Sequence, residues 1–177
     1  MSDAANYDVQ APGAHGPVRK TSSVTWKERT GKKIPIASGH TELSVVLVVG
    51  ETNTESQPIF CLTLREKPVV SKWNKSVVTL NKAECDWLLS NIDQLVADVE
   101  VEHVTENKHG EKIRTLHVVK KKAAKGSTTI CFNQKKNGGV YNLSVPKTRV
   151  PMLKKYISEA MAEYQNLVKE PTCETQL

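Results

Sequence analysis

Apolar and polar residues alternate along most of the chain between residues 22 and 80, as they do in half-buried β-strands. The alternating segments cover residues 22–29, 41–49, 57–66 and 75–80. In the third of them Phe60 and Leu64 share one face, whereas Arg65 belongs to the other. The pattern predicts an antiparallel sheet with one buried face and one wet face.

The pattern changes to a helical period after residue 80. Asn81 can act as an N-cap, and Glu84 stands three residues later, where it can complete a capping box. Apolar residues then recur at positions 85, 88, 92, 95, 96 and 99. Residues 21–98 are therefore predicted to form a first ββββα unit.

The second half of the chain repeats this order. Extended segments cover residues 99–106, 111–120, 127–133 and 140–145, with turns at 107–110 and 137–139. Asn137-Gly138 is the strongest short hairpin signal in the sequence. Thr148 is expected to cap a helix that holds Pro151 in its first turn. Its apolar positions are 150, 153, 157, 160, 161 and 164, and the second unit covers 99–169.

The two helices match each other when the sequence is shifted by 65 residues. Each apolar position of the first helix meets an apolar or aromatic residue of the second, and the preceding strands agree in phase. Any two amphipathic helices can be aligned, but the strand phase favours an internal duplication. A unit of this size buries its apolar face poorly alone. The predicted fold class is α+β, with two ββββα repeats whose antiparallel sheets pack as an intramolecular pseudo-dimer.

The chain ends and the cysteines bear on where the protein is located. Residues 1–20 are predicted to be a disordered tail, and 170–177 a flexible one. We find no secretory signal and no apolar run long enough to span a membrane. Cys61, Cys85, Cys131 and Cys173 are far apart, which favours reduced thiols over a metal site. We expect an intracellular protein, nuclear or cytoplasmic, without a cofactor.

The charge favours an acidic partner, of which nucleic acid is the commonest. The net charge is +6, and the interval 103–126 is rich in Lys and Arg. Trp26 and Trp73 each lie next to cations, so their rings are candidates for stacking on unpaired bases. The candidate contacts are Trp26, Lys27, Arg29, Arg65, Lys67, Lys72, Trp73 and Lys75 in the first unit, and Lys112, Arg114, Lys120, Lys122, Lys135 and Lys136 in the second.

Each candidate has an alternative interpretation. Basic residues along 120–125 can form a solvated strand edge, or a nuclear import segment. Trp26 can face the core instead of the solvent, whereas Trp73 is expected to be exposed. Trp87 and Phe132 fall in apolar patterns, and we assign both to packing.

Residues 61–95 resemble the family of the transcriptional coactivator positive cofactor four. That family has a strand ending in an Ile-Arg-Glu-like triplet, matched here by Leu64-Arg65-Glu66. A basic loop follows, then a strand end matched by Val78-Thr79-Leu80-Asn81. Cys85 replaces the family's helix Trp, and the loop 67–74 is shorter and lacks glycine. Whirly and PUR proteins look like variations on this unit, and PUR repeats place two units in one chain.

The resemblance implies ββββα subunits that pair and bind single-stranded DNA on a β-saddle. By position it implies contacts from Arg65, Lys67, Trp73 and Lys75, and the internal repeat adds Asn133, Lys135 and Lys136. The expected function is binding of single-stranded nucleic acid, DNA before RNA, with little sequence specificity, in transcription, replication or genome maintenance. A homodimer or higher assembly, and transcription or replication proteins as partners, stay open.

The sequence also bears on two other classes of function, enzymes and protein–protein interaction modules. No sequence motif of a hydrolase, a metalloprotease or a phosphate-binding loop is present, and the five histidines are dispersed. We therefore expect a protein that is not an enzyme. The alternative to nucleic-acid binding is a protein–protein interaction or adaptor module whose duplicated sheet docks a partner chain.

Overall fold

The computed structural model describes residues 23–36, 39–55, 57–94, 100–106, 108–122 and 126–169. The predicted tails, 1–20 and 170–177, lie outside these residues, as do three positions of the first helical stripe and the end of the 120–125 segment. No helix in the described ranges is both long and apolar enough to cross a bilayer.

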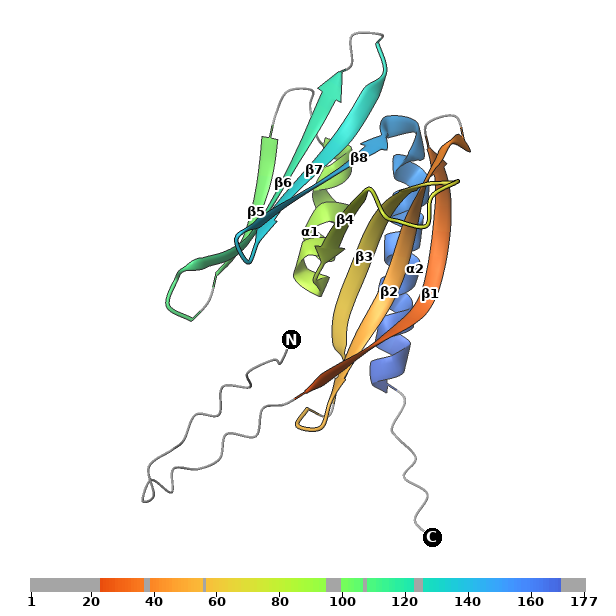
Figure 1. Ribbon diagram of the computed structural model, residues 1–177. Helices are drawn as coiled ribbons and strands as arrows, with labels where there is room; N and C mark the ends of the chain where they lie inside the picture. Colours follow the sequence, from red (N-terminus) through yellow and green to blue (C-terminus); the bar gives the residue numbers. More distant parts are fainter. Residues whose placement is uncertain are drawn as a thin grey trace, which may run out of the picture.

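Two four-stranded antiparallel sheets, each followed by a helix, make up the fold (Figure 1). Sheet 1 has the order β1 (Val24–Ile36), β2 (Thr41–Thr52), β3 (Ile59–Pro68) and β4 (Ser76–Leu80), and α1 (Lys82–Asn91) follows it. Sheet 2 has the order β5 (Glu100–Glu106), β6 (Lys112–Lys122), β7 (Thr128–Lys136) and β8 (Gly139–Pro146), and α2 (Val150–Lys169) follows it. The predicted α+β class with two ββββα units is confirmed at this level.

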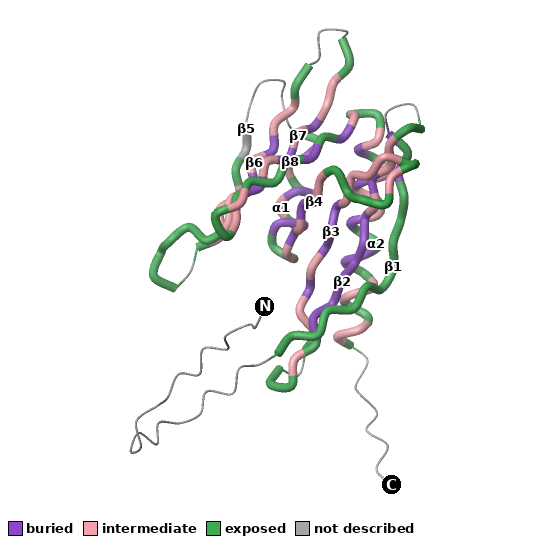
Figure 2. The backbone as a smooth tube through the Cα atoms, in the orientation of Figure 1, coloured by how far each residue is buried: buried purple, intermediate pink, exposed green. Residues whose placement is uncertain are grey.

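Strand β1 is longer than the predicted segment 22–29, because it continues to Ile36. Its register against β2 shifts between Glu28 and Gly31, where a bulge interrupts the alternation. The alternation resumes only at the buried Ile34 and Ile36, because Gly31, Lys32 and Lys33 directly after the bulge are all exposed. Pairing with the buried strand β2 keeps them extended nonetheless (Figure 2).

The predicted capping box at the start of α1 is confirmed. The Asn81 side chain accepts from the Glu84 N–H at 2.8 Å, and the Glu84 carboxylate accepts from the Asn81 N–H at 2.8 Å. The helix ends at Asn91 and passes into the 3-10 turn Ile92–Gln94, so it is shorter than the predicted stripe.

The prediction of Thr148 as a helix cap is wrong. Thr148 lies inside the 3-10 turn Lys147–Arg149, whose N-cap position is taken by Pro146 and has no side-chain hydrogen bond. The chain is therefore already turning before Thr148. Pro151 is in the first turn of α2, as expected. The hairpin at Asn137-Gly138 is also confirmed, with φ of 49° and 73°, the positive values that a tight primed turn requires.

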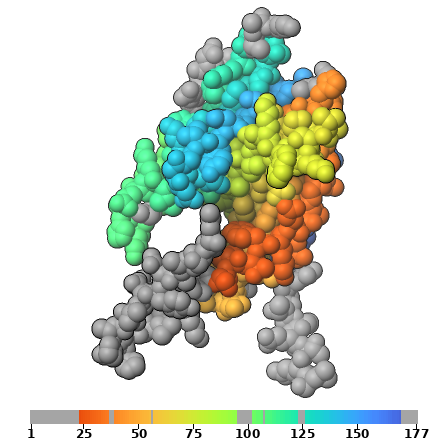
Figure 3. All heavy atoms as spheres, viewed as in Figure 1, coloured from red at the N-terminus to blue at the C-terminus, as the bar shows by residue number. Residues whose placement is uncertain are grey.

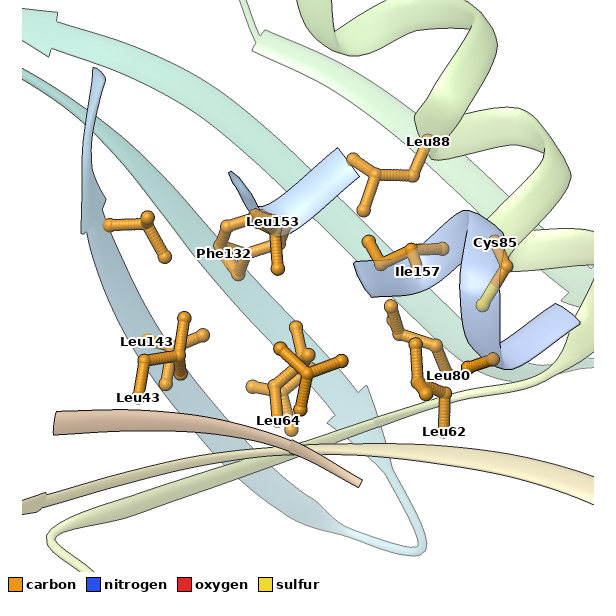
Figure 4. Packing of buried hydrophobic residues seen from close by; sticks show 14 of the residues in the cluster. Leu43, Leu62, Leu64, Leu80, Cys85, Leu88, Phe132, Leu143, Leu153 and Ile157 are labelled. Carbon is orange, nitrogen blue, oxygen red and sulfur yellow. The ribbon is translucent and has the colours of Figure 1, made fainter. Parts of the chain in front are cut away.

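The inner faces of the two sheets and both helices bury one hydrophobic cluster (Figure 4). The apolar stripe of α2 contributes Val150, Leu153, Ile157, Ala160 and Met161 to it. Helix α2 packs against β1, β2 and β3, which belong to the first unit (Figure 1). Near its end the Tyr164 hydroxyl donates to the Pro58 carbonyl at 2.7 Å. The helix of the second unit therefore covers the sheet of the first.

Side chains from sheet 2 also satisfy the outer edge of β4. The fully buried Gln134 accepts from the Thr79 N–H at 3.2 Å and donates to the Thr79 carbonyl. Arg114 donates to the same carbonyl at 2.6 Å and to both oxygens of Glu84, at 3.0 and 2.8 Å. Since β4 is an edge strand, these bonds pair backbone groups that would otherwise be left open. They join the two units through polar contacts beside the shared core.

Candidate nucleic-acid interface

The register of β1 places two neighbouring candidates on opposite faces of sheet 1. Trp26 lies opposite Gly50, on the outer face, and its side chain is 52% exposed. A Cβ atom at Gly50 would lie within 2.9 Å of the Trp26 ring, so this glycine makes room for the indole. Lys27 lies opposite Val49, a core residue, and therefore occupies a position on the inner face of sheet 1. The two side chains cannot contact the same strand of nucleic acid on one face.

Most candidate cations of the first unit already have a carboxylate partner. Lys27 pairs with Glu51 at 2.6 Å, Lys67 with Glu42 at 3.7 Å, Lys75 with Glu66 at 3.4 Å, and Arg65 with Glu28. Exposed pairs of this kind add little stability, but they cancel the positive charge that a phosphate would meet. Within the described residues, Arg29 and Lys72 have no such partner.

The loop between β3 and β4 presents Trp73 to the solvent, as predicted. Its side chain is 82% exposed. Ser71 holds the loop: its hydroxyl accepts from the Trp73 N–H at 3.0 Å and donates to the Trp73 carbonyl at 3.2 Å. Val69 and Val70 are exposed in the same loop. The loop therefore carries an apolar tip that the core does not use.

The candidate cations of β6 share the phase of the core residues Leu116 and Val118. They are Lys112, Arg114, Lys120 and Lys122. Arg114 is held at the junction between the units. Lys120 lines a small hollow of about 170 Å³ with Asp93 and Lys147, away from the outer face. Lys112 lies beside the 137–138 turn, in a hollow of about 400 Å³ that also contains Lys135 and Lys136.

The outer face of sheet 2 is hollowed, with a volume of about 460 Å³. The side chains that line it are His117, Val119, Lys121, Cys131, Asn133, Lys135, Asn142 and Ser144, among others. Lys121 and Lys135 have no ion pair within the part of the chain that the structure describes. Among the described residues, the candidate cations of this face are therefore not paired with carboxylates, whereas most of those in the first unit are.

A second hollow, of about 580 Å³, lies between the ends of β4 and β8. Its lining includes Glu66, residues 74–77 and residues 140–144. Figure 3 shows the light-blue atoms of β8 beside the yellow atoms of the segment that precedes β4. Both hollows are lined by Asn142, Leu143 and Ser144, so they adjoin across β8. We call the joined surface, 74–77, 140–144 and the sheet 2 hollow, the β8 furrow.

Lys136 and Tyr141 lie at one edge of the β8 furrow. The Lys136 ammonium stands 5.2 Å from the centre of the Tyr141 ring and donates to the Thr79 hydroxyl. Burial, with a further contribution from the nearby Arg114, lowers the pKa of Lys136. This candidate is therefore partly committed to the junction, whereas Asn133 and Lys135 face the hollow directly.

Sequence reasoning missed four residues of this surface: His117, Lys121, Tyr141 and Asn142. For His117, Lys121 and Asn142 the signal was the parity of positions along β6 and β8, whereas Tyr141 shares the phase of the buried Leu143 and Val145, so parity does not identify it. Leu116 and Val118 are the buried residues of β6, so the odd-numbered residues between and beyond them face outward. The candidate lysines of this strand were chosen by charge without regard to phase, and they lie in the inner phase of sheet 2.

The remaining sequence interpretations concern packing. Phe132 is buried in the core, and Trp87 packs against the edge of this core. The centre of the Trp87 ring lies 5.5 Å from the centre of the His103 ring. Cys85 is buried, whereas Cys61 and Cys131 are half-buried, and all three are free thiols. Burial raises the pKa of both the Cys61 and the Cys85 thiol. Among the described residues, no group of three or more His, Cys, Asp or Glu side chains is placed to hold a metal ion.

Comparison with known proteins gives no family for the chain. No family model matches its sequence, and no curated protein matches it. The β8 furrow and the β3–β4 loop are therefore the features of the molecule that bear on its function.

Proposed function

We propose that this protein binds single-stranded nucleic acid along the β8 furrow. The observation that carries the proposal is that the two hollows share residues 142–144 in their linings, and that one of them contains Lys121 and Lys135, which have no ion pair among the described residues. A flexible strand needs a track of cations for its phosphates and flat side chains for its bases. Tyr141 lies in the furrow, and Trp73 is exposed in the adjoining loop.

We further propose that the chain is a two-unit variant of the fold found in positive cofactor four, Whirly and PUR proteins. The order of four strands and a helix, given twice, supports this. The shared core and the position of α2 on sheet 1 support the intramolecular pseudo-dimer. In this proposal the ligand is single-stranded DNA in preference to RNA. The protein acts in transcription, replication or genome maintenance.

The proposed binding differs from the sequence-based expectation in where it is centred. The expected saddle was distributed over both units, with Arg65, Lys67 and Lys75 prominent in the first. Those three cations are paired with carboxylates, whereas Lys121 and Lys135 on the outer face of sheet 2 have no ion pair in the described ranges. We therefore assign most of the phosphate contact to sheet 2 and a stacking role to Trp73.

The test is a fluorescence anisotropy titration of labelled oligo-dT of about 15 nucleotides, within the usual range for such sites, with duplex DNA and RNA as competitors. Affinity is expected to fall steeply with salt, and Lys135→Ala should reduce the slope against log salt by about 0.7. Trp73→Ala should cost about 1–3 kcal/mol of binding. Lys155→Ala, which removes a charge from the exposed side of α2, is the matched control. Salt-independent binding, or none, would overturn the proposal.

A second candidate function is favoured by the apolar tip of the β3–β4 loop. Val70 is 98% exposed, and Val69 and Trp73 are exposed beside it. Exposed apolar side chains in one loop are typical of protein docking sites. If Trp73→Ala leaves oligonucleotide affinity unchanged, the loop is assigned to a protein partner instead.

A further inference from the structure

A row of polar side chains crosses the hollow on the outer face of sheet 2. The register of the four strands aligns Glu102, His117, Asn133 and Asn142 across β5, β6, β7 and β8. The Asn133 Nδ2 atom donates to the Asn142 Oδ1 atom, and the His117 Nε2 atom lies 3.6 Å from the Glu102 carboxylate. Lys121 and Lys135 line the same hollow.

The hydrogen bond between the two asparagines leaves an uneven set of free groups. Asn142 keeps two N–H donors and a second lone pair on its oxygen, whereas Asn133 keeps its carbonyl oxygen and one N–H donor. The two lysines offer donors only, and neither is ion-paired within the described ranges. Counting the two asparagines and the two lysines, the hollow therefore presents more free donors than amide acceptors.

Nucleobases differ in the groups that they would bring to such a surface. Thymine, uracil and guanine have a carbonyl oxygen beside a ring N–H on their pairing edge. Cytosine and adenine have an amino group beside a ring nitrogen that accepts. A carbonyl can accept from Asn142 or a lysine while the ring N–H donates to Asn133. An amino group in that place would set donor against donor, which leaves polar groups unpaired.

We propose that the sheet 2 hollow is a base-selective subsite for bases with a carbonyl next to a ring N–H on the pairing edge, namely thymine, uracil and guanine. The inference rests on the proposed function, because the base arrives as part of a bound single strand. It goes beyond that function, because a cationic track with stacking rings alone would be indifferent to sequence. The selectivity belongs to Asn133 and Asn142, and the lysines add donors and phosphate contact.

The experiment compares oligo-dU with oligo-dC of equal length, because these bases differ only in the groups at the pairing edge. The parent protein is expected to bind oligo-dU about fivefold more tightly, a modest value for paired hydrogen bonds to a base. The double variant Asn133→Val/Asn142→Val should lose this ratio while it keeps the salt dependence. Valine is favoured in strands, so the sheet should persist, and thermal unfolding checks this.

The outcomes separate the two proposals. Equal binding of the two oligonucleotides by the parent overturns the subsite and leaves the proposed function standing. Failure to bind either one overturns the proposed function. A ratio that survives in the valine variant places selectivity elsewhere and also overturns the subsite. If the valine pair fails to fold, Asn133→Thr/Asn142→Thr replaces it, since a cross-strand threonine pair suits a sheet and lacks the amide groups.

Discussion

Glu84 illustrates how one residue can serve two structures at once. The sequence shows its role in the capping box, because the Asn81-to-Glu84 spacing is local. Its second role, as the partner of Arg114, depends on a residue thirty positions away. No local sequence pattern indicates that contact, and Arg114 was therefore predicted to contact nucleic acid. The exposed Trp73 was predictable because cations flank it in a loop.

Arg114→Met is expected to destabilise the fold by about 3 kcal/mol, because it leaves the fully buried Glu84 carboxylate without its counter-ion. Adding Glu84→Gln should recover part of this loss, since glutamine can still complete the capping box. Chemical denaturation of the parent, both single variants and the double variant measures the coupling. Additive effects of the two substitutions would show that the pair is not coupled.

Cys85 should make stability depend on pH in the alkaline range. Burial raises the pKa of its thiol above the ordinary value of 9.0, while in the unfolded chain the thiol ionises near that value. The unfolded state therefore loses its proton first, and the free energy of unfolding falls as pH rises above about 9. Relative to Cys85→Ala, the parent should lose about 1 kcal/mol more between pH 8 and pH 10. Parallel pH profiles in urea denaturation would contradict this.

At the scale of elements, the spacing of apolar residues along the sequence predicted each strand and helix, but not always the residues at which it begins and ends. It failed in β1, where polar residues stay extended because β2 supplies the hydrogen bonds. It also failed at Thr148, because a 3-10 turn precedes α2. On β6 the strand itself was predicted, but its candidate contacts were chosen by charge and not by parity. The alternation of the strand shows which residues face outward, once its buried residues are known.

Asn81→Ala tests the cap of α1. The substitution removes the acceptor for the Glu84 N–H and should cost about 1 kcal/mol of stability. Asn74→Ala is the matched control, because Asn74 is exposed in the β3–β4 loop and caps no helix. Thermal or urea unfolding measures both. An equal effect of the two substitutions would show that the cap contributes nothing specific.

At the scale of the whole molecule, the repeat was visible in the sequence but the position of its helices was not. A shift of 65 residues aligns the two units. It does not say which sheet each helix covers, because an apolar stripe fits either inner face. In the structure α2 lies on β1, β2 and β3, and Arg114 and Gln134 reach back to Thr79. The two units therefore depend on each other for burial and for edge pairing.

This dependence predicts that residues 21–98 do not fold alone. Without α2, the inner face of sheet 1 would expose residues such as Leu43, Leu47 and Leu62, which are fully buried in the intact chain. Each of them loses roughly 1.5–3 kcal/mol of burial, which a small sheet with one short helix cannot replace. Mixing the fragment with residues 99–169 should restore a cooperative unfolding transition in circular dichroism, because the second fragment supplies α2. A cooperative transition in 21–98 by itself would mean that α2 is dispensable for sheet 1, and that the two units fold as independent domains.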